Sequence, residues 1–92
     1  MRESYIISYD LRGGDEDSDD YEKLIAGIKD YQYWGKLMLS TWIVVTERSA
    51  VEIRDKLEEF LDDDDRLFVA PVGKPAAWRN VIAQNDWLKN RP

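Results

Sequence analysis

The chain has 92 residues, of which 43% are hydrophobic and 35% are charged, so its length and composition fit one small globular domain. It contains no cysteine and no histidine, which excludes disulfides, thiolate or imidazole metal ligands, and catalysis by either side chain. The net charge is −6, and any chemistry must depend on carboxylates, hydroxyls, lysine, arginine and the backbone.

The acidic residues are concentrated in two segments. Residues 15–20 hold five of the nineteen and residues 62–65 hold four, so basic residues outnumber acidic ones in the rest of the chain. The sequence has no apolar run long enough to span a membrane, and its first residues lack the apolar stretch of a secretory signal. We therefore expect a soluble, cytoplasmic protein that does not contact membranes.

Residues 4–11 alternate between large and small side chains, as in a strand whose two faces meet different surroundings. The large side chains, expected to face a helix-covered core, are Tyr5, Ile7, Tyr9 and Leu11. The other side chains, expected on the opposite face, are Ser4, Ile6, Ser8 and Asp10. The sequence therefore predicts a first strand with one buried face.

A helix is expected after the acidic segment, because apolar residues then recur at helical spacing. The positions are Tyr21, Leu24, Ile25, Ile28 and Gln32, of which the first four are apolar. Residues 36–46 are strongly β-prone but are too many for one ordinary strand. We expect two antiparallel strands here, with a reversal near Ser40 and Thr41 whose position the sequence does not settle.

Ser49 and Glu52 have the spacing of a capping box, which predicts the start of a second helix. Its apolar stripe consists of Ile53, Leu57, Phe60 and Leu61. Most of the aspartate run 62–65 belongs in the following loop, because carboxylates oppose the dipole at a helix C-terminus. Residues 66–72 are expected to form the last strand, and Pro71 requires that strand to lie at a sheet edge.

The C-terminal part of the chain is expected to extend the domain. Pro75 can begin a short helix that carries Trp78, Val81 and Ile82. Residues 84–92 form a tail that Trp87 and Leu88 would anchor.

The order of elements, β-α-β-β-α-β, predicts a ferredoxin-like α+β fold, with a four-stranded antiparallel sheet and two helices on one face. We expect residues 1–92 to form a single domain, with a core at about 4–72 and a helical or tail extension at 73–92. The second face of the sheet is uncovered, and an apolar surface of this kind usually marks an interface. We expect a homodimer through this face, formed by Ile6, Ser8 and Trp42, with Met38 as the alternative to Trp42.

Asp10 is the most informative candidate site residue, because it ends the first strand on the uncovered face. Two copies of Asp10 near a two-fold axis would repel unless a proton or a divalent cation lies between them. Oxygen ligands suit Mg²⁺ or Mn²⁺, which can polarise a phosphodiester. Alternatively, Asp10 only ends the strand and accepts hydrogen bonds from the turn at Gly13 and Gly14.

The four tryptophans also allow two interpretations. They could form a stacking platform for single-stranded nucleic acid, or they could complete a small core or an interface. Trp34, beside Gly35 and Lys36, is the best placed for a surface contact.

Three segments resemble the small CRISPR-associated adaptation proteins that partner the integrase subunit. Residues 5–11, YIISYDL, resemble their first strand ending in Tyr-Asp. Residues 39–42, LSTW, resemble their central segment with its serine, and residues 64–68, DDRLF, resemble their last strand. The virulence-associated protein D toxins share that fold. The chain is still more similar to the SinR family of small bacterial and phage proteins, which is unrelated to the sporulation repressor.

The resemblance, which covers about residues 4–72, implies a ferredoxin-like homodimer that in some members is a metal-dependent endonuclease on RNA or DNA. In those members the aspartate matching Asp10 is the metal-linked residue, and the serine matching Ser40 lies near it. In other members the same dimer is a non-catalytic scaffold. The chain departs from the adaptation proteins in that the acidic segment 15–20 replaces a basic helix start, and only Arg12 remains nearby.

The leading functional hypothesis is therefore a Mg²⁺- or Mn²⁺-dependent nuclease, with no organic cofactor, that acts as a homodimer on RNA or DNA. Asp10 from both subunits would hold the ion, Ser40 would assist, and Arg12 would stabilise charge in the transition state. The acidic loops oppose phosphate binding. The alternative is a non-catalytic dimeric interaction or scaffold module that binds a protein partner. A toxin silenced by a cognate partner would share the chemistry of the nuclease.

Overall fold

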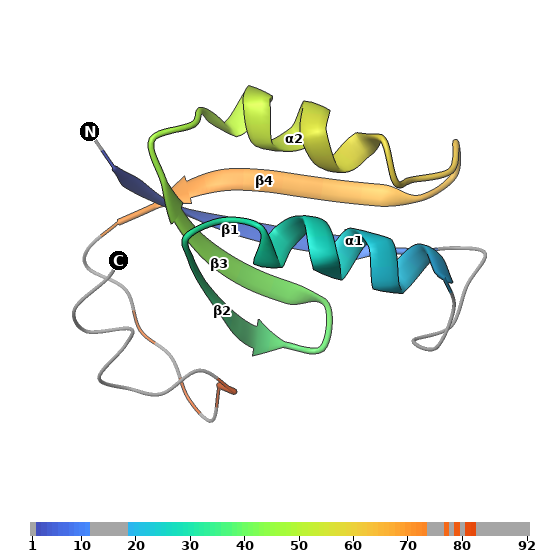
Figure 1. The fold of residues 1–92 in the computed structure, drawn as a ribbon. Helices are drawn as coiled ribbons and strands as arrows, with labels where there is room; N and C mark the ends of the chain where they lie inside the picture. The colour runs from blue at the N-terminus through green and yellow to red at the C-terminus, as the bar shows by residue number, and fades with distance from the viewer. Residues whose placement is uncertain (1, 12–18, 74–76, 78, 80, 83–92) are drawn as a thin grey trace.

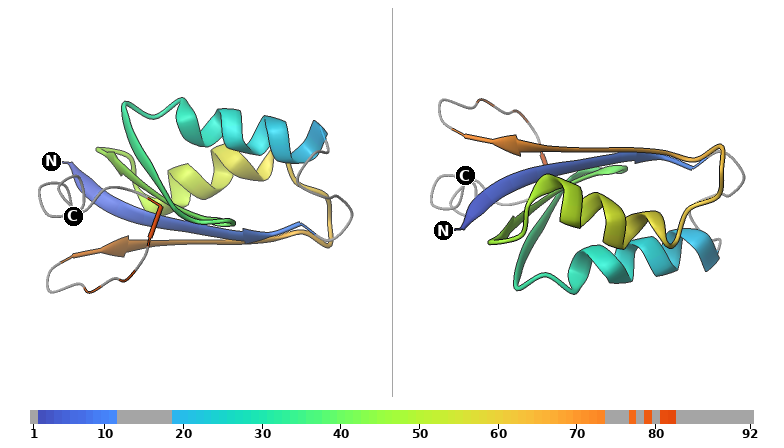
Figure 2. Two further views of the ribbon diagram at one scale, coloured as in Figure 1. Left: turned by 90° about the horizontal axis from the view of Figure 1, so that it is seen from below. Right: turned by 90° about the horizontal axis from the view of Figure 1, so that it is seen from above.

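The computed structural model describes residues 2–11, 19–73, 77, 79, 81 and 82 (Figure 1). In chain order the elements are β1 (Glu3–Asp10), α1 (Asp19–Lys29), β2 (Tyr33–Met38), β3 (Thr41–Thr46), α2 (Ala50–Glu58) and β4 (Arg66–Val72). The strands form one four-stranded antiparallel sheet in the order β2-β3-β1-β4. Both helices lie on the same side of this sheet, as the views in Figure 2 show. The ferredoxin-like α+β prediction is confirmed.

The core lies between the sheet and the two helices. The expected inward residues of β1 are all buried, and they pack with residues of β3, α1 and α2. The cluster consists of Tyr5, Ile7, Tyr9, Leu11, Leu24, Ile28, Trp42, Val44, Ile53 and Leu57. Alternation along β1 therefore identified the buried face correctly, because side chains of a strand point to opposite faces in turn.

The segment between the helices forms the expected two strands, and the reversal occupies Leu39 and Ser40. It therefore lies one residue before the expected Ser40–Thr41 pair. β2 also begins earlier than expected, at Tyr33, because α1 ends at Lys29. The assignment of Gln32 to the helical stripe is wrong, since the aromatic pair at residues 33 and 34 already belongs to β2.

A complete capping box begins α2, as the sequence predicts. The Glu52 amide donates to Ser49 Oγ, and the Ser49 amide donates to Glu52 Oε1, each at 3.2 Å. The hydrogen bond from the Ser49 backbone, followed by that from Arg48, lowers the pKa of Glu52. The stabilisation from the Glu52 carboxylate is thus present above its ordinary pKa of 4.5 and is lost as the pH falls through the lowered pKa.

Replacing Ser49 by alanine is expected to lower the free energy of unfolding by about 1 kcal/mol, because one amide at the helix start loses its acceptor. Ser49→Asp should keep most of the stability, since aspartate is an equally good N-cap residue. Urea denaturation followed by circular dichroism at neutral pH measures both variants. Equal losses in the two variants would contradict a capping role for the Ser49 side chain.

Among the described strands, β4 pairs with β1 alone and lies at one edge of the sheet. Pro71 is placed opposite Tyr5 in this strand. Proline has no N–H to donate to a further strand, and this is why the sequence predicted an edge position. The strand order confirms that prediction.

The sheet face opposite the helices, which we call the helix-free face, is buried over one part and exposed over another. Ile43 is only 3% exposed although it lies on this face opposite Ile6, and Ser4 and Val45 are buried beside it. Met38 and Phe68 are 54% and 64% exposed. The expectation of a uniformly bare face is therefore wrong: the exposed apolar part is confined to one end of the sheet.

Of the C-terminal extension, the structure describes residues 77, 79, 81 and 82, and none of these four is helical. The expected helix after Pro75 therefore does not include Val81 or Ile82. The Ile82 amide instead donates to the Leu37 carbonyl at 3.0 Å, which brings the extension to β2. Trp78, Trp87 and Leu88 lie outside the described residues.

Candidate functional site

The end of the sheet where β1 finishes brings together residues that are far apart in the sequence. β1 and β4 are antiparallel, so the last residue of β1, Asp10, is paired with the first residue of β4, Arg66. Arg66 Nη1 donates to Asp10 Oδ2 at 3.3 Å, and the two side chains are 67% and 60% exposed. Solvent screens such a pair, so its contribution to stability is at most about 1 kcal/mol. The Asp10 carboxylate is thus accessible.

The turn that carries Ser40 is attached to the same end of the sheet. The Tyr9 amide donates to the Ser40 carbonyl at 3.1 Å, directly before Asp10 in the chain. Next to it, Ser8 Oγ and Thr41 Oγ1 share a hydrogen bond of 3.1 Å. The topology therefore places Ser40 and Asp10 at one end of the sheet, which we call the Asp10 end. Arg12, the third expected catalytic residue, lies outside the described residues.

The helix-free face is the surface on which Asp10 lies. Ile6, Ser8 and Asp10 alternate with the buried residues of β1, as expected. One row across all four strands of this face is formed by Met38, Thr41, Ser8 and Phe68. The outer members of this row, Met38 and Phe68, are exposed apolar side chains that flank the hydrogen-bonded Ser8 and Thr41, and neither α1 nor α2 covers them.

The expectation that Trp42 belongs to this uncovered face is wrong. Trp42 lies opposite Ile7, on the helix-covered side, and is only 2% exposed. Its indole Nε1–H donates to the Tyr9 hydroxyl at 3.1 Å inside the core. The reversal at Leu39 and Ser40 determines the register of β3, and a shift of one residue would have turned Trp42 to the other face.

Arg66 is the functional candidate that the sequence analysis missed. The sequence predicts that Arg66 begins an edge strand, but the partner of its side chain depends on which strand pairs with β4. Once β4 pairs antiparallel with β1, Arg66 must face the end of β1. The motif at residues 64–68 identified the strand and gave no role to its arginine.

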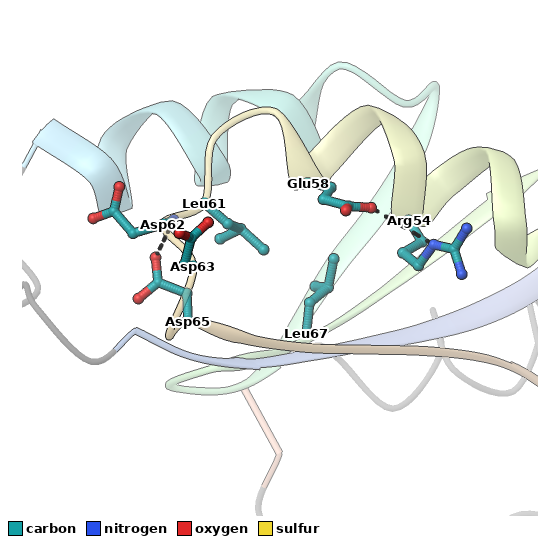
Figure 3. A pocket seen from close by; sticks show the side chains of 7 residues that line it. All are labelled: Arg54, Glu58, Leu61, Asp62, Asp63, Asp65 and Leu67. Carbon is teal, nitrogen blue, oxygen red and sulfur yellow. Dashed lines mark hydrogen bonds and ion pairs between the residues drawn. The ribbon is translucent and has the colours of Figure 1, made fainter.

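A second polar feature lies between the end of α2 and the start of β4. Figure 3 shows this pocket, of about 390 Å³, lined by Arg54, Glu58, Leu61, Asp62, Asp63, Asp65 and Leu67. Asp65 Oδ2 accepts from the Asp62 amide at 2.8 Å, so this carboxylate stabilises the turn of its own loop. Glu58 lies 3.7 Å from Arg54 Nε. The aspartate run is therefore a loop, as predicted, with part of its hydrogen-bonding capacity used locally.

Comparison with known proteins gives a fold and no activity. No family model matches the sequence. The structure is similar to the crystal structure of a hypothetical protein, TT1823, from Thermus thermophilus, with a TM-score of 0.70 and 23% sequence identity. The similarity covers 88% of this chain and 94% of that one. Within the described residues, neither helix has the length and apolar character needed to cross a bilayer.

Proposed function

We propose that the chain is a homodimeric, Mg²⁺-dependent nuclease that cleaves phosphodiester bonds of RNA or DNA. The supporting observation is the position of Asp10, an exposed carboxylate at the end of β1 on the helix-free face. The exposed Met38 and Phe68 lie on the same face at the same end. Packing of two copies through this apolar surface, about a two-fold axis, would bring the two Asp10 side chains near each other.

The donor chemistry at the Asp10 end fits a hard divalent cation, because Mg²⁺ is commonly held by one or two carboxylates together with water. When bound, the ion polarises a phosphoryl oxygen and lowers the pKa of a water molecule. Each Asp10 supplies a carboxylate ligand. Arg66, released from its exposed ion pair with Asp10, supplies a guanidinium for a phosphate oxygen. Ser40 offers a hydroxyl at the same end, and Arg12 would add a second cation.

Asp10→Asn is expected to lower the rate of Mg²⁺-dependent cleavage at least about a hundredfold, because the contribution of a bound ion amounts to several kcal/mol. Labelled single-stranded and double-stranded RNA and DNA serve as substrates, with Mg²⁺, Mn²⁺ or EDTA. Sedimentation velocity of the same samples shows whether the variant keeps the oligomeric state of the wild type.

Asp55→Asn is the control variant. Asp55 is also an exposed aspartate paired with an arginine, Arg54 at 2.8 Å, but it lies on α2 away from the sheet. Cleavage by Asp55→Asn should equal that of the wild type. If Asp10→Asn cleaves as fast as the control, Asp10 has no role and the proposed site is wrong.

The Asp10–Arg66 ion pair favours a second candidate function, a non-catalytic dimeric interaction or scaffold module. In that case Asp10 joins the end of β1 to the start of β4, and the exposed surface of the chain binds a protein partner. A purified dimer that leaves all four substrates intact with Mg²⁺ and with Mn²⁺ would decide for this module.

A further inference from the structure

A group of lysines and aromatic rings lies at the opposite edge of the sheet from β4. Lys29 ends α1, and Trp34 and Lys36 are on β2, the edge strand that follows α1 in Figure 1. Lys29 Nζ lies 5.1 Å from the ring centroid of Trp34, which is tilted by 55° against Trp42 at a centroid distance of 5.7 Å. We call Lys29, Trp34 and Lys36 the Trp34 edge.

The buried Trp42 ring packs against the Trp34 edge. Lys36 Nζ lies 5.5 Å and Lys29 Nζ 5.8 Å from the centroid of the Trp42 ring. Trp42 is fixed by its hydrogen bond to Tyr9, whereas Trp34 is 38% exposed. A partly exposed ring is therefore packed against a buried ring, and both ammonium groups lie within 6 Å of a ring centroid of the pair.

Among the described residues, Lys29 and Lys36 have no acidic partner, unlike four other cations. Arg48, Arg54, Lys56 and Arg66 each form an ion pair with a carboxylate. Within the described part of the chain, Lys29 and Lys36 make only their contacts with the tryptophan rings. Exposed cation–π contacts are weak, so both ammonium groups can turn to an anionic ligand at little cost.

We infer that the Trp34 edge binds single-stranded nucleic acid, with a base stacked on Trp34 and backbone phosphates at Lys29 and Lys36. Stacking on an aromatic ring combined with nearby cations is how proteins hold single strands without sequence preference. A duplex is a poorer ligand, because its bases are already stacked. The inference rests on the proposed function for its substrate class, but not for cleavage, since Trp34 lies on the helix-covered side and Asp10 on the helix-free face.

The binding test uses the full chain and fluorescein-labelled oligothymidylate and oligouridylate, each of about 20 nucleotides, which exceeds the usual site size. Fluorescence anisotropy at low salt in EDTA measures binding without cleavage. Trp34→Ala should weaken binding about 5- to 150-fold, the range expected when one stacked base is lost. The oligothymidylate and oligouridylate arms show whether DNA and RNA are bound equally.

The salt dependence tests the lysines. Two phosphate contacts on a single strand predict a slope of about −1.4 for log K against log salt concentration. Lys36→Gln or Lys29→Gln should reduce the slope to about −0.7. Lys23→Gln is the control, because Lys23 is exposed on α1, carries the same charge and contacts neither ring. It should leave the slope unchanged.

The inference is overturned by no binding of the wild type at low salt, or by equal effects of Lys23→Gln and Lys36→Gln. Polyglutamate that competes as well as the oligonucleotide would also overturn it, because the edge would then recognise acidic chains in general. If Trp34→Ala fails to fold by circular dichroism, Trp34→Phe replaces it, and most of the quenching of tryptophan fluorescence by oligothymidylate should be lost. Binding is measured in EDTA and cleavage with Mg²⁺, so a failure of cleavage and a failure of this site are distinguishable.

Discussion

Trp42→Ala is expected to lower the free energy of unfolding by about 3–5 kcal/mol, one of the largest losses that a single substitution in this chain can produce. Trp42 is 2% exposed and packs in the core between β3 and the helices. The substitution leaves a cavity and removes the indole that donates to the Tyr9 hydroxyl at 3.1 Å. Urea denaturation followed by far-ultraviolet circular dichroism measures the loss without relying on tryptophan fluorescence.

Trp34→Ala is the comparison for this prediction, because it also replaces a tryptophan by alanine, at the position whose ring packs against Trp42. Trp34 is 38% exposed, so its removal should cost about 1 kcal/mol and leave the fold intact. Similar losses in the two variants would contradict the assignment of Trp42 to the core and of Trp34 to the surface.

Phe68→Glu is expected to raise the dissociation constant of the proposed homodimer at least about a hundredfold. In a two-fold interface the substitution occurs twice, and each phenylalanine contributes at least about 1.5 kcal/mol when buried. Two carboxylates would also be placed in an apolar contact, which adds to the loss. Sedimentation velocity over a concentration series should show a monomer where the wild type is a dimer, and Asp10-dependent cleavage should fall in parallel.

Ala26→Glu provides the control for Phe68→Glu. Ala26 is an exposed residue of α1, on the helix side of the sheet, and the substitution adds the same charge. The dimer should persist in this variant. A wild type that is monomeric at all concentrations, or equal dissociation in both variants, would show that the helix-free face is not the dimer interface.

Local chemistry explains why several elements were predicted correctly. The alternation along β1, the capping box at Ser49 and the edge position of Pro71 each depend on a residue and its near neighbours in the chain. Periodicity, side-chain capping and the missing proline N–H act over a few residues, so a sequence contains all the information that they need.

Gly27 shows what local chemistry cannot reveal. In the sequence it only weakens a helix, but a Cβ at this position would lie 2.9 Å from a ring carbon of Phe60 and 3.1 Å from a methyl carbon of Leu57. The glycine thus permits the close approach of α1 to the segment that ends α2. That requirement exists only after the two helices have packed on the sheet.

The sequence by itself determined the fold class, the order of elements, the buried face of β1 and the exclusion of cysteine and histidine chemistry. Only the tertiary structure decided on which face of the sheet Trp42 lies, which residue pairs with Asp10, and which part of the helix-free face is exposed. These features depend on strand register and on contacts between distant segments, such as residues 10 and 66 or 34 and 42. A one-residue change in a turn reverses the facing of a strand, so the position of the turn at Leu39 and Ser40 had to be known first.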